Sequence, residues 1–375
     1  MRAKDRYAAI ERELRLHGKA NVNWLAKALG TSVISIRRDL NVLQERGVAK
    51  RIHGGAVFVG DPLRPLSVPH AGPNHSGAEA PSAGVFTERS PKRDDEIIGL
   101  IVPGAAYYYA GVIAGAEEMA NSLGFRLVLA VSGYSGERER KQVERLIAIG
   151  AKGLIIAPSV HASEDGTTYD VLSGLNIPAV LMERNADLQR LDVVYSDHAV
   201  GAAEGLKHLA DLGHMGAALI AGAHSPTTPG LASGFERAQK WFHPDRCRTF
   251  LVPSLVWDEE RTKQLHDALD WCLAHGTTAV LVHSDEMALL FAQIALARGL
   301  RIPTDLSIVA YDDEIAALAD PPLDAVSPPK REVGRQAVKL CAERLEAGTT
   351  AAPPRHIGLL PQYIHRRSTA PPQHG

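Results

Sequence analysis

The sequence has little that would suit a disulfide-stabilised or membrane protein. Its 375 residues include only three cysteines, widely spaced and without a Cys-x-x-Cys pair, so neither a disulfide framework nor a structural zinc site is expected. No run of eighteen apolar residues is present, the length that a membrane-spanning helix needs. The first sixteen residues are charged and lack the apolar core of a signal peptide. We therefore expect a cytoplasmic protein without membrane association.

The motifs of common enzyme classes are also missing. The segment IVPGAAYYYAG lacks the Gly-x-Gly-x-x-Gly spacing of dinucleotide-binding enzymes, and no Gly-x-x-x-x-Gly-Lys-Ser/Thr loop is present. There is no Gly-x-Ser-x-Gly motif, and the sixteen histidines form no His-Glu-x-x-His pattern. His208 and His214 flank the end of a predicted helix, and we expect structural roles for them. The sequence predicts no enzyme: no catalytic residues, no metal site and no cofactor.

Charge is distributed unevenly along the chain, although the formal net charge is only -2. Residues 1–60 contain twelve Lys and Arg against five Asp and Glu, a net charge of +7. The remaining residues contain 29 Lys and Arg against 38 Asp and Glu, a net charge of -9. A basic segment on an acidic chain indicates an anionic partner for that segment alone.

The basic segment has the pattern of three helices followed by a hairpin. Ser32 can cap the third helix, whose core face would be Ile36, Leu40 and Leu43. VAKRI and AVFV, on either side of a His-Gly-Gly turn, predict two short strands. This order of elements is typical of a helix–turn–helix domain, in which the second helix of the motif enters the major groove of DNA.

The outward face of the third helix contains the residues that we expect to contact DNA. Arginine can donate two hydrogen bonds to guanine O6 and N7, or bind phosphate. The hairpin would act as a wing that presents its basic side chains to the DNA backbone. The predicted DNA-binding residues are Ser32, Ser35, Arg37, Arg38, Lys50, Arg51 and His53.

The rest of the chain changes character twice. Residues 61–93 hold six prolines and three glycines without sustained periodicity, which predicts a linker. From residue 94, short apolar runs such as IIGLIV, FRLVLAV, KGLIIAP, IPAVLM, MGAALIAG, TTAVLVH and DLSIVAY alternate with amphipathic segments. This alternation predicts α/β lobes with parallel sheets, and seven or more strands are too many for one ordinary sheet. We expect two lobes with a ligand cleft at the carboxyl ends of their strands, and a tail at 370–375.

Two segments resemble known families. SVISIRRDLNVLQERGVAKRIHGGA resembles the winged-helix signature of the DeoR family of bacterial regulators, with Ser35 where that family usually has Thr. From about residue 96 to 369 the chain is similar to the effector domain of the LacI/GalR regulators and to periplasmic sugar-binding proteins. The second resemblance lies in IIGLIVP, AKGLIIAPS, NIPAVLMERN, LKHLADLGHMGAALIAG, SDEMALLFAQIALARGLRIPTDLSIVAYDDE and LLPQYIHRRST. Together they imply a winged helix–turn–helix at 1–60 and a two-lobed, periplasmic-binding-protein-like α/β domain at 94–369.

The LacI/GalR resemblance also implies where an effector binds. Aromatic side chains in the first loop and carboxylates after two strands are typical contacts, and Asp285 is expected to cap the helix that it begins. Departures occur at Leu231, where an Arg is common, at Ser284 for Asn, and at Lys330 for an aromatic residue. They imply a pocket without the usual guanidinium fork but with an ammonium at one edge. The predicted effector-binding residues are Tyr107, Tyr108, Tyr109, Glu183, Ser284, Asp312 and Lys330.

These observations predict a ligand-responsive transcriptional regulator that binds double-stranded operator DNA as a homodimer. The resemblance favours a repressor of carbohydrate-related genes whose small-molecule effector is a sugar or sugar derivative; an unusual polyol or a carboxylated ligand stays open. The alternatives are an activator, a regulator of a non-sugar ligand, a sugar-processing enzyme and a transport binding protein. The expected mechanism is a population shift, because a ligand that prefers one lobe closure changes how the DNA-binding domains are presented.

Overall fold

The computed structural model describes residues 6–7, 10, 19–22, 25–26, 29, 31–45, 48–52, 55–58, 96–159, 166–184, 191–252, 259–347 and 353–373. Two compact units result, Met1–Gly84 and Val85–Gly375, with the division inside the predicted linker. Among the described residues, no helix is long and apolar enough to cross a membrane. His53, predicted to contact DNA, lies outside the described residues.

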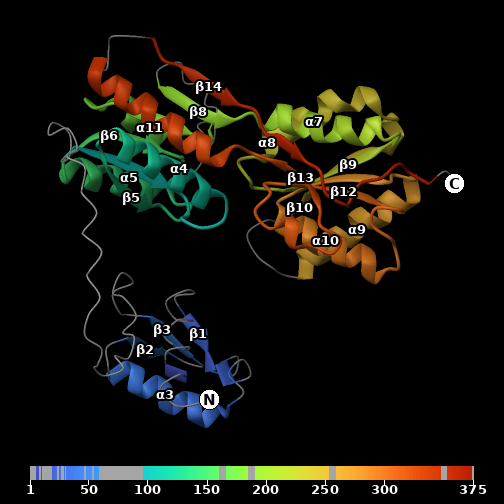
Figure 1. Cartoon of the computed structure of the whole chain (residues 1–375), viewed down its shortest axis with the longest axis horizontal. Helices are drawn as coiled ribbons and strands as arrows, with labels where there is room; N and C mark the ends of the chain where they lie inside the picture. The colour runs from blue at the N-terminus through green and yellow to red at the C-terminus, as the bar shows by residue number, and fades with distance from the viewer. Residues whose placement is uncertain are drawn as a thin grey trace, which may run out of the picture. The chain divides into compact units, whose positions relative to one another are not determined.

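The first unit contains one described long helix and a small antiparallel sheet (Figure 1). Ile36, Leu40 and Leu43 are fully buried, which confirms the predicted core face of the helix. The sheet has the order β1-β3-β2, so the predicted hairpin is joined by a third strand that the sequence did not reveal. The elements are β1 (Lys19–Asn21), α3 (Val33–Glu45), β2 (Ala49–Ile52) and β3 (Gly55–Phe58).

The second unit begins with lobe 1, whose six strands are all parallel, in the order β14-β8-β7-β6-β4-β5. Helices α4 and α11 cover one face of this sheet and α5 and α6 cover the other. The strands are β4 (Ile97–Val102), β5 (Arg126–Val131), β6 (Ala151–Ile156), β7 (Ala179–Met182), β8 (Asp192–Ser196) and β14 (His356–Leu359). The helices are α4 (Tyr108–Ser122), α5 (Gly136–Ala148), α6 (Thr167–Ser173) and α11 (Lys330–Ala347).

Lobe 2 repeats this plan with the strand order β10-β9-β11-β12-β13-β15, in which only β15 is antiparallel to its neighbour. Helices α7 and α8 cover one face and α9 and α10 the other. The strands are β9 (Ala217–Gly222), β10 (Cys247–Val252), β11 (Ala279–His283), β12 (Ser307–Tyr311), β13 (Asp324–Ser327) and β15 (Gln362–Ile364). The helices are α7 (His198–Asp211), α8 (Thr228–Ala238), α9 (Glu259–His275) and α10 (Asp285–Ala297), with short 3-10 turns at Gln239–Trp241, Pro244–Arg246 and Ala316–Leu318.

All seven predicted apolar runs form strands; six of them are largely buried on both faces of a parallel sheet, and FRLVLAV forms the partly exposed edge strand β5. The chain crosses between the lobes from β8 to α7, from β13 to α11 and from β14 to β15. Strands of both sheets therefore end where the lobes face each other, which confirms the two-lobed fold.

His214 has the structural role that the sequence predicted. It is buried, and its ring nitrogens lie 2.7 Å from Thr278 Oγ1, 3.1 Å from Ser307 Oγ and 3.0 Å from the carbonyl oxygen of Ala370. Burial lowers the pKa of His214 to about 4, so the imidazole is neutral at neutral pH. The bond to Ala370 shows that the first residue of the predicted tail is held against lobe 2.

Candidate effector-binding and DNA-binding sites

A cavity of about 400 Å³ lies between the two lobes, which is a suitable size for a small organic ligand. Most of its lining residues follow directly after the carboxyl end of a strand, where open α/β sheets bind ligands. Lobe 1 contributes Tyr107, Tyr108, Tyr109, Tyr134, Ser159, Glu183 and Arg184. Lobe 2 contributes His198, Gly222, His224, Ser225, Pro226, Thr227, Arg261, His283, Ser284, Glu286, Met287 and Asp312.

The backbone is strained at four of these lining residues. Tyr107, Tyr134, Glu183 and Asp312 have φ angles of 54°, 57°, 53° and 98°. Residues other than glycine rarely adopt positive φ, and such strain costs roughly 1–3 kcal/mol per residue. The surrounding structure must stabilise these conformations, which aim the three side chains predicted from the family resemblance at one cavity.

The Glu183 carboxylate is bonded to groups from both lobes. Its Oε1 accepts hydrogen bonds from Tyr108 Oη at 2.7 Å and Ser196 Oγ at 3.0 Å. Its Oε2 accepts from the Ser196 amide at 3.0 Å and lies 3.6 Å from His198 Nε2. Burial alone would raise the pKa of Glu183, but His198, Ser196 and Tyr108 outweigh it and lower that pKa. Glu183 is therefore an ionised group that holds Tyr108 and His198 in place on the cavity wall.

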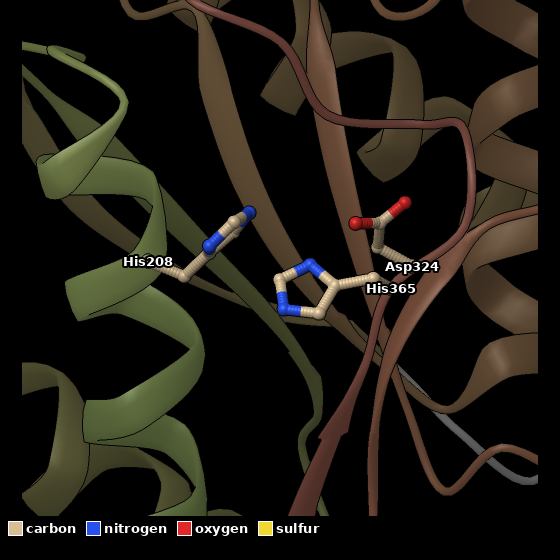
Figure 2. Close-up of side chains that lie close together, drawn as sticks. All are labelled: His208, Asp324 and His365. Carbon is tan, nitrogen blue, oxygen red and sulfur yellow. The ribbon is translucent and has the colours of Figure 1, made fainter.

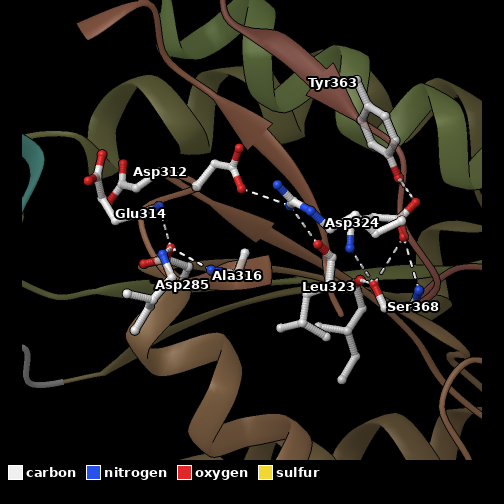
Figure 3. Close-up of polar contacts among 12 residues, drawn as sticks. Asp285, Asp312, Glu314, Ala316, Leu323, Asp324, Tyr363 and Ser368 are labelled. Carbon is white, nitrogen blue, oxygen red and sulfur yellow. Dashed lines mark hydrogen bonds and ion pairs between the residues drawn. The ribbon is translucent and has the colours of Figure 1, made fainter. Parts of the chain in front are cut away.

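A second contact between the lobes joins Tyr107 to Asp285. The Tyr107 hydroxyl donates to Asp285 Oδ1. Asp285 Oδ2 accepts from the backbone amides of Glu314, Ile315 and Ala316, and Figure 3 shows the contacts to Glu314 and Ala316. The expectation that Asp285 caps its own helix is therefore wrong. The fully buried carboxylate instead holds the loop that follows β12, a long-range contact that local spacing does not reveal.

Lys330 forms the third contact between the lobes. This first residue of α11 in lobe 1 donates to the carbonyl oxygen of Asp312 and lies 2.5 Å from Glu314 Oε1 in lobe 2. Its side chain is 10% exposed and does not line the cavity, in contrast to the other six predicted effector-binding residues. The expected ammonium at the pocket edge thus faces Glu314 rather than the cavity, and it positions the backbone of Asp312.

Asp312 and His283 are two cavity-lining residues that each have a polar atom without a hydrogen-bond partner among the described residues. Asp312 Oδ2 lies 3.5 Å from His283 Nε2, whereas Asp312 Oδ1 and His283 Nδ1 are buried and have no hydrogen-bond partner among the described residues. Burial raises the pKa of Asp312 to about 8 against the opposing charge of Lys330, and burial lowers the pKa of His283 to about 3. At neutral pH both groups are therefore uncharged, and each retains unused hydrogen-bonding capacity.

The cavity also contains guanidinium groups, although Leu231 occupies the usual arginine position. Leu231 is fully buried in the core of lobe 2 and does not line the cavity. Arg184, which follows Glu183, and Arg261 of α9 lie on the wall instead. The expectation of a pocket without guanidinium donors is therefore wrong. The donors come from the loop after β7 and from α9, not from the position of Leu231 in α8. The sequence analysis did not identify Arg261, Tyr134 or His283. His283 could have been recognised, because it is a polar residue at the end of a buried strand.

In the first unit, the exposed face of α3 is the candidate DNA-binding surface. Ser32 Oγ accepts the amide of Ser35 at 3.1 Å, which confirms the predicted helix cap. Arg37 and Arg38 are exposed, and Ile34, which is 79% exposed, precedes them on the same face at helical spacing. The sequence reading missed Ile34, an apolar side chain that is available to contact a thymine methyl group.

The remaining charges of the first unit have separate roles. Asp39, beside Arg38 in the sequence, is 1% exposed and pairs with Arg6 at 2.7 Å and 3.0 Å. This ion pair joins α3 to the N-terminal part of the first unit. Lys50 is exposed on β2, in agreement with its predicted place in the wing. Arg51 lies in the same strand, and its side chain is outside the described part of the chain.

Comparisons with known proteins match both units. A DeoR-like helix–turn–helix domain matches residues 6–61, and a periplasmic binding protein-like domain matches residues 206–369. The chain is 28% identical over 278 residues to the HTH-type transcriptional regulator DegA of Bacillus subtilis, covering 73% of this chain and 81% of that protein. It is 29% identical over 274 residues to the arabinose metabolism transcriptional repressor of Geobacillus stearothermophilus, covering 70% and 75%.

A solved structure of the dimeric Lac repressor, with an 11-residue C-terminal deletion, has the same fold with a TM-score of 0.62 and 24% identity. The similarity covers 74% of this chain and 100% of that one. These matches confirm both resemblances found in the sequence, and the two named relatives are transcriptional regulators, not enzymes.

Proposed function

We propose that this transcriptional regulator, which joins a DeoR-like helix–turn–helix domain to a periplasmic binding protein-like domain, is a repressor controlled by a small sugar-like effector. It binds double-stranded operator DNA through α3 and the wing, and it binds the effector in the cavity between the lobes. The relative named for arabinose metabolism supports a carbohydrate-related role. The proposed compartment is the cytoplasm, where operator DNA is found.

One observation carries the proposal. The cavity whose walls include polar atoms without hydrogen-bond partners among the described residues is also the cavity beside which the two lobes contact each other. Tyr107 binds Asp285, and Glu183 faces His198, each pair with one member in each lobe. A ligand that bonds to Asp312 or His283 while touching the lobe 1 tyrosines must favour one lobe closure over another. That difference in affinity is what a population shift requires.

The cavity wall indicates the chemistry of the effector. A ligand hydroxyl can both donate and accept, so it can satisfy the neutral Asp312 carboxyl and the neutral His283 ring together. The lobe 1 tyrosines provide ring faces for the apolar face of a sugar. Arg184 and Arg261 add positive charge, which favours an effector that has a carboxylate or phosphate besides its hydroxyls.

The proposed assembly is a homodimer that binds two half-sites. A single α3 can reach only a few base pairs, and two-fold proteins bind pseudo-palindromic sites. Strands β5 and β10 form sheet edges that expose Leu129, Val131 and Leu251 at 41%, 40% and 54%. Exposed apolar side chains on edge strands, which pair on one side only, favour coverage by another chain, and this supports pairing of the lobes of two copies.

A thermal-unfolding screen of the full chain tests the proposed effector. The panel contains neutral pentoses, hexoses and disaccharides, polyols, sugar acids and sugar phosphates. A ligand that binds only the folded protein raises the unfolding temperature. We expect at least one compound class to do so, with the largest shift for a polyhydroxy compound that is also anionic.

Two variants make the screen specific for the cavity. Asp312→Ala should abolish the shift, whereas Asp267→Ala, at an exposed position of α9, should retain it. An unchanged shift in Asp312→Ala would show that the effector binds elsewhere, and the absence of a shift with every class would argue against a sugar-like effector.

A further inference from the structure

A second cluster of ligand-type side chains lies in lobe 2, away from the effector cavity. His208 is on α7, Asp324 is the first residue of β13, and His365 follows the last residue of β15. One nitrogen or carboxylate oxygen from each of the three lies within 4.8 Å of the others. Figure 2 shows the three side chains converging from these separate elements.

The topology of lobe 2 explains why these residues meet. Strand β13 is parallel to β12, so its first residue lies at the amino edge of the sheet, opposite the edge that borders the cavity. Strand β15 is antiparallel to β13 and pairs Ile364 with Ala325, so the residue after it reaches the same edge. Helix α7 starts near the cavity at His198 and returns along the sheet, which brings His208 to that edge as well.

The Asp324 carboxylate is held rigidly, as carboxylates that bind metal ions usually are. It is 2% exposed. Its Oδ1 accepts hydrogen bonds from the amide of Ser368 at 2.9 Å and from Ser368 Oγ at 3.3 Å. Its Oδ2 accepts from Tyr363 Oη at 3.1 Å and Thr369 Oγ1 at 2.9 Å (Figure 3 shows the contacts to Tyr363 and Ser368). These bonds fix the direction of the carboxylate toward the two histidines.

The His208 ring, which is partly buried, also packs against neighbouring rings. The His208 ring lies 4.4 Å from the Tyr363 ring and 4.9 Å from the His365 ring, measured between centroids.

We propose that His208, Asp324 and His365 form a binding site for one divalent transition-metal ion, with zinc as the best match to their two nitrogen ligands and one oxygen ligand. The ion would fasten α7 to the strands β13 and β15. None of the three residues lines the effector cavity, so this site does not depend on the proposed effector.

The observed spacing is compatible with zinc after a small adjustment. Ligands about 2.0–2.2 Å from a tetrahedral zinc ion lie roughly 3.3–3.5 Å apart, closer than the 4.8 Å limit found here. His365 is exposed and free to rotate toward the other two. The Thr369 hydroxyl, which bonds both His208 Nε2 at 3.2 Å and Asp324 Oδ2, is the group that the ion would displace. The exposed side of the site leaves room for a water molecule as the fourth ligand.

Zinc titration of the full chain, without a histidine tag and after dialysis against a chelator, tests the site. The comparison is between wild type, His365→Gln, His208→Gln and the control His356→Gln, an exposed histidine on β14. We expect wild type and the control to bind one more zinc ion than His365→Gln and His208→Gln, or to bind it at least tenfold more tightly. We also expect zinc to raise the unfolding temperature of wild type more than that of either cluster variant.

Cobalt provides a second measurement that does not rely on affinity alone. Co²⁺ bound by nitrogen and oxygen ligands gives visible absorption bands, which should appear in wild type and in His356→Gln but weaken in His365→Gln. Because His365 is exposed, this variant should fold like wild type. Equal zinc stoichiometry and affinity in wild type and His365→Gln, together with identical cobalt spectra, would overturn the proposal and leave the cluster as a purely structural hydrogen-bond network.

Discussion

Helix α3 and the cavity between the lobes present their polar groups in opposite ways. Arg37 and Arg38 are exposed to solvent on the α-helix α3. Asp312 and His283 are buried at strand ends, Asp312 with a positive φ angle and both with pKa values displaced by burial. A surface for a polyanion needs charges that stay charged in water. A site for a small hydroxylated ligand needs groups that are buried and left partly unsatisfied until the ligand binds.

The largest effect that we expect comes from the cavity, at Asp312. Asp312→Ala removes one of the two unpartnered atoms that a ligand hydroxyl would satisfy, and it also removes the neighbour of His283. Calorimetry with the compound found by thermal unfolding should show a hundredfold or greater loss of affinity, since an unsatisfied buried group and a lost hydrogen bond each cost about 1–3 kcal/mol. DNA affinity without effector should stay unchanged. Equal effector affinity in the variant and wild type would remove Asp312 from the site.

The next largest effect belongs to the exposed arginines of α3. Replacement of Arg37 or Arg38 by Ala should cost about 1–3 kcal/mol on the specific operator and much less on random duplex, if that side chain contacts a base edge. Fluorescence anisotropy on both duplexes measures this difference. Equal losses on the two duplexes for both arginines would assign them to phosphate contacts alone.

The buried carboxyl of Asp312 should make stability depend on pH. Its pKa is raised from 3.8 to about 8, so between these values the unfolded chain is ionised while the folded protein keeps the proton, and stability falls as pH rises. His283 acts in the opposite direction, but only between its folded pKa of about 3 and its ordinary 6.5. Above pH 6.5 the effect of Asp312 is therefore isolated.

In that window Asp312→Asn, which cannot ionise, is the matched variant. Urea unfolding between about pH 6.5 and 8 should show wild type losing up to about 1.4 kcal/mol per pH unit relative to the variant. Parallel pH profiles for the two proteins would mean that Asp312 ionises in the folded protein as it does in water.

The smallest effect is expected for Lys50, an exposed residue of the wing. Lys50→Ala should weaken binding to specific and random duplexes by the same few-fold factor, because a phosphate contact has no sequence preference. The slope of log affinity against log salt should fall by about 0.9. A loss confined to the specific duplex would place Lys50 at a base instead.

The exposed helix could be predicted from the sequence because its determinants are local. Ser32 caps α3, and Ile36, Leu40 and Leu43 recur at helical spacing, so the outward direction of Arg37 and Arg38 follows from four residues of pattern. The buried strands were predictable for the same reason. Strands β8, β10, β13, β14 and β15 were missed, because each contains polar or charged residues and none is a continuous apolar run.

The cavity was only partly predictable because its contacts join distant segments. The family resemblance led to six of its lining residues, among them Glu183, but not to Arg261. Asp285 looked like a local helix cap, yet its carboxylate binds amides about thirty residues away. Lys330 looked like a free charge, yet Glu314 faces it from the other lobe. In each case the partner is set by the order of strands in a sheet or by the contact between the lobes, and spacing along the chain encodes neither.

The central claim is that a ligand in the interlobe cavity controls DNA binding by the helix–turn–helix domain. It is tested most directly by anisotropy of the full chain on its operator, with and without the compound that raises the unfolding temperature, in wild type, Asp312→Ala and Asp267→Ala. We predict that the compound changes operator affinity by at least fivefold in wild type and Asp267→Ala, the lower end of ordinary allosteric coupling, and leaves Asp312→Ala unaffected. Operator affinity that is the same with and without the bound compound in wild type would contradict the account.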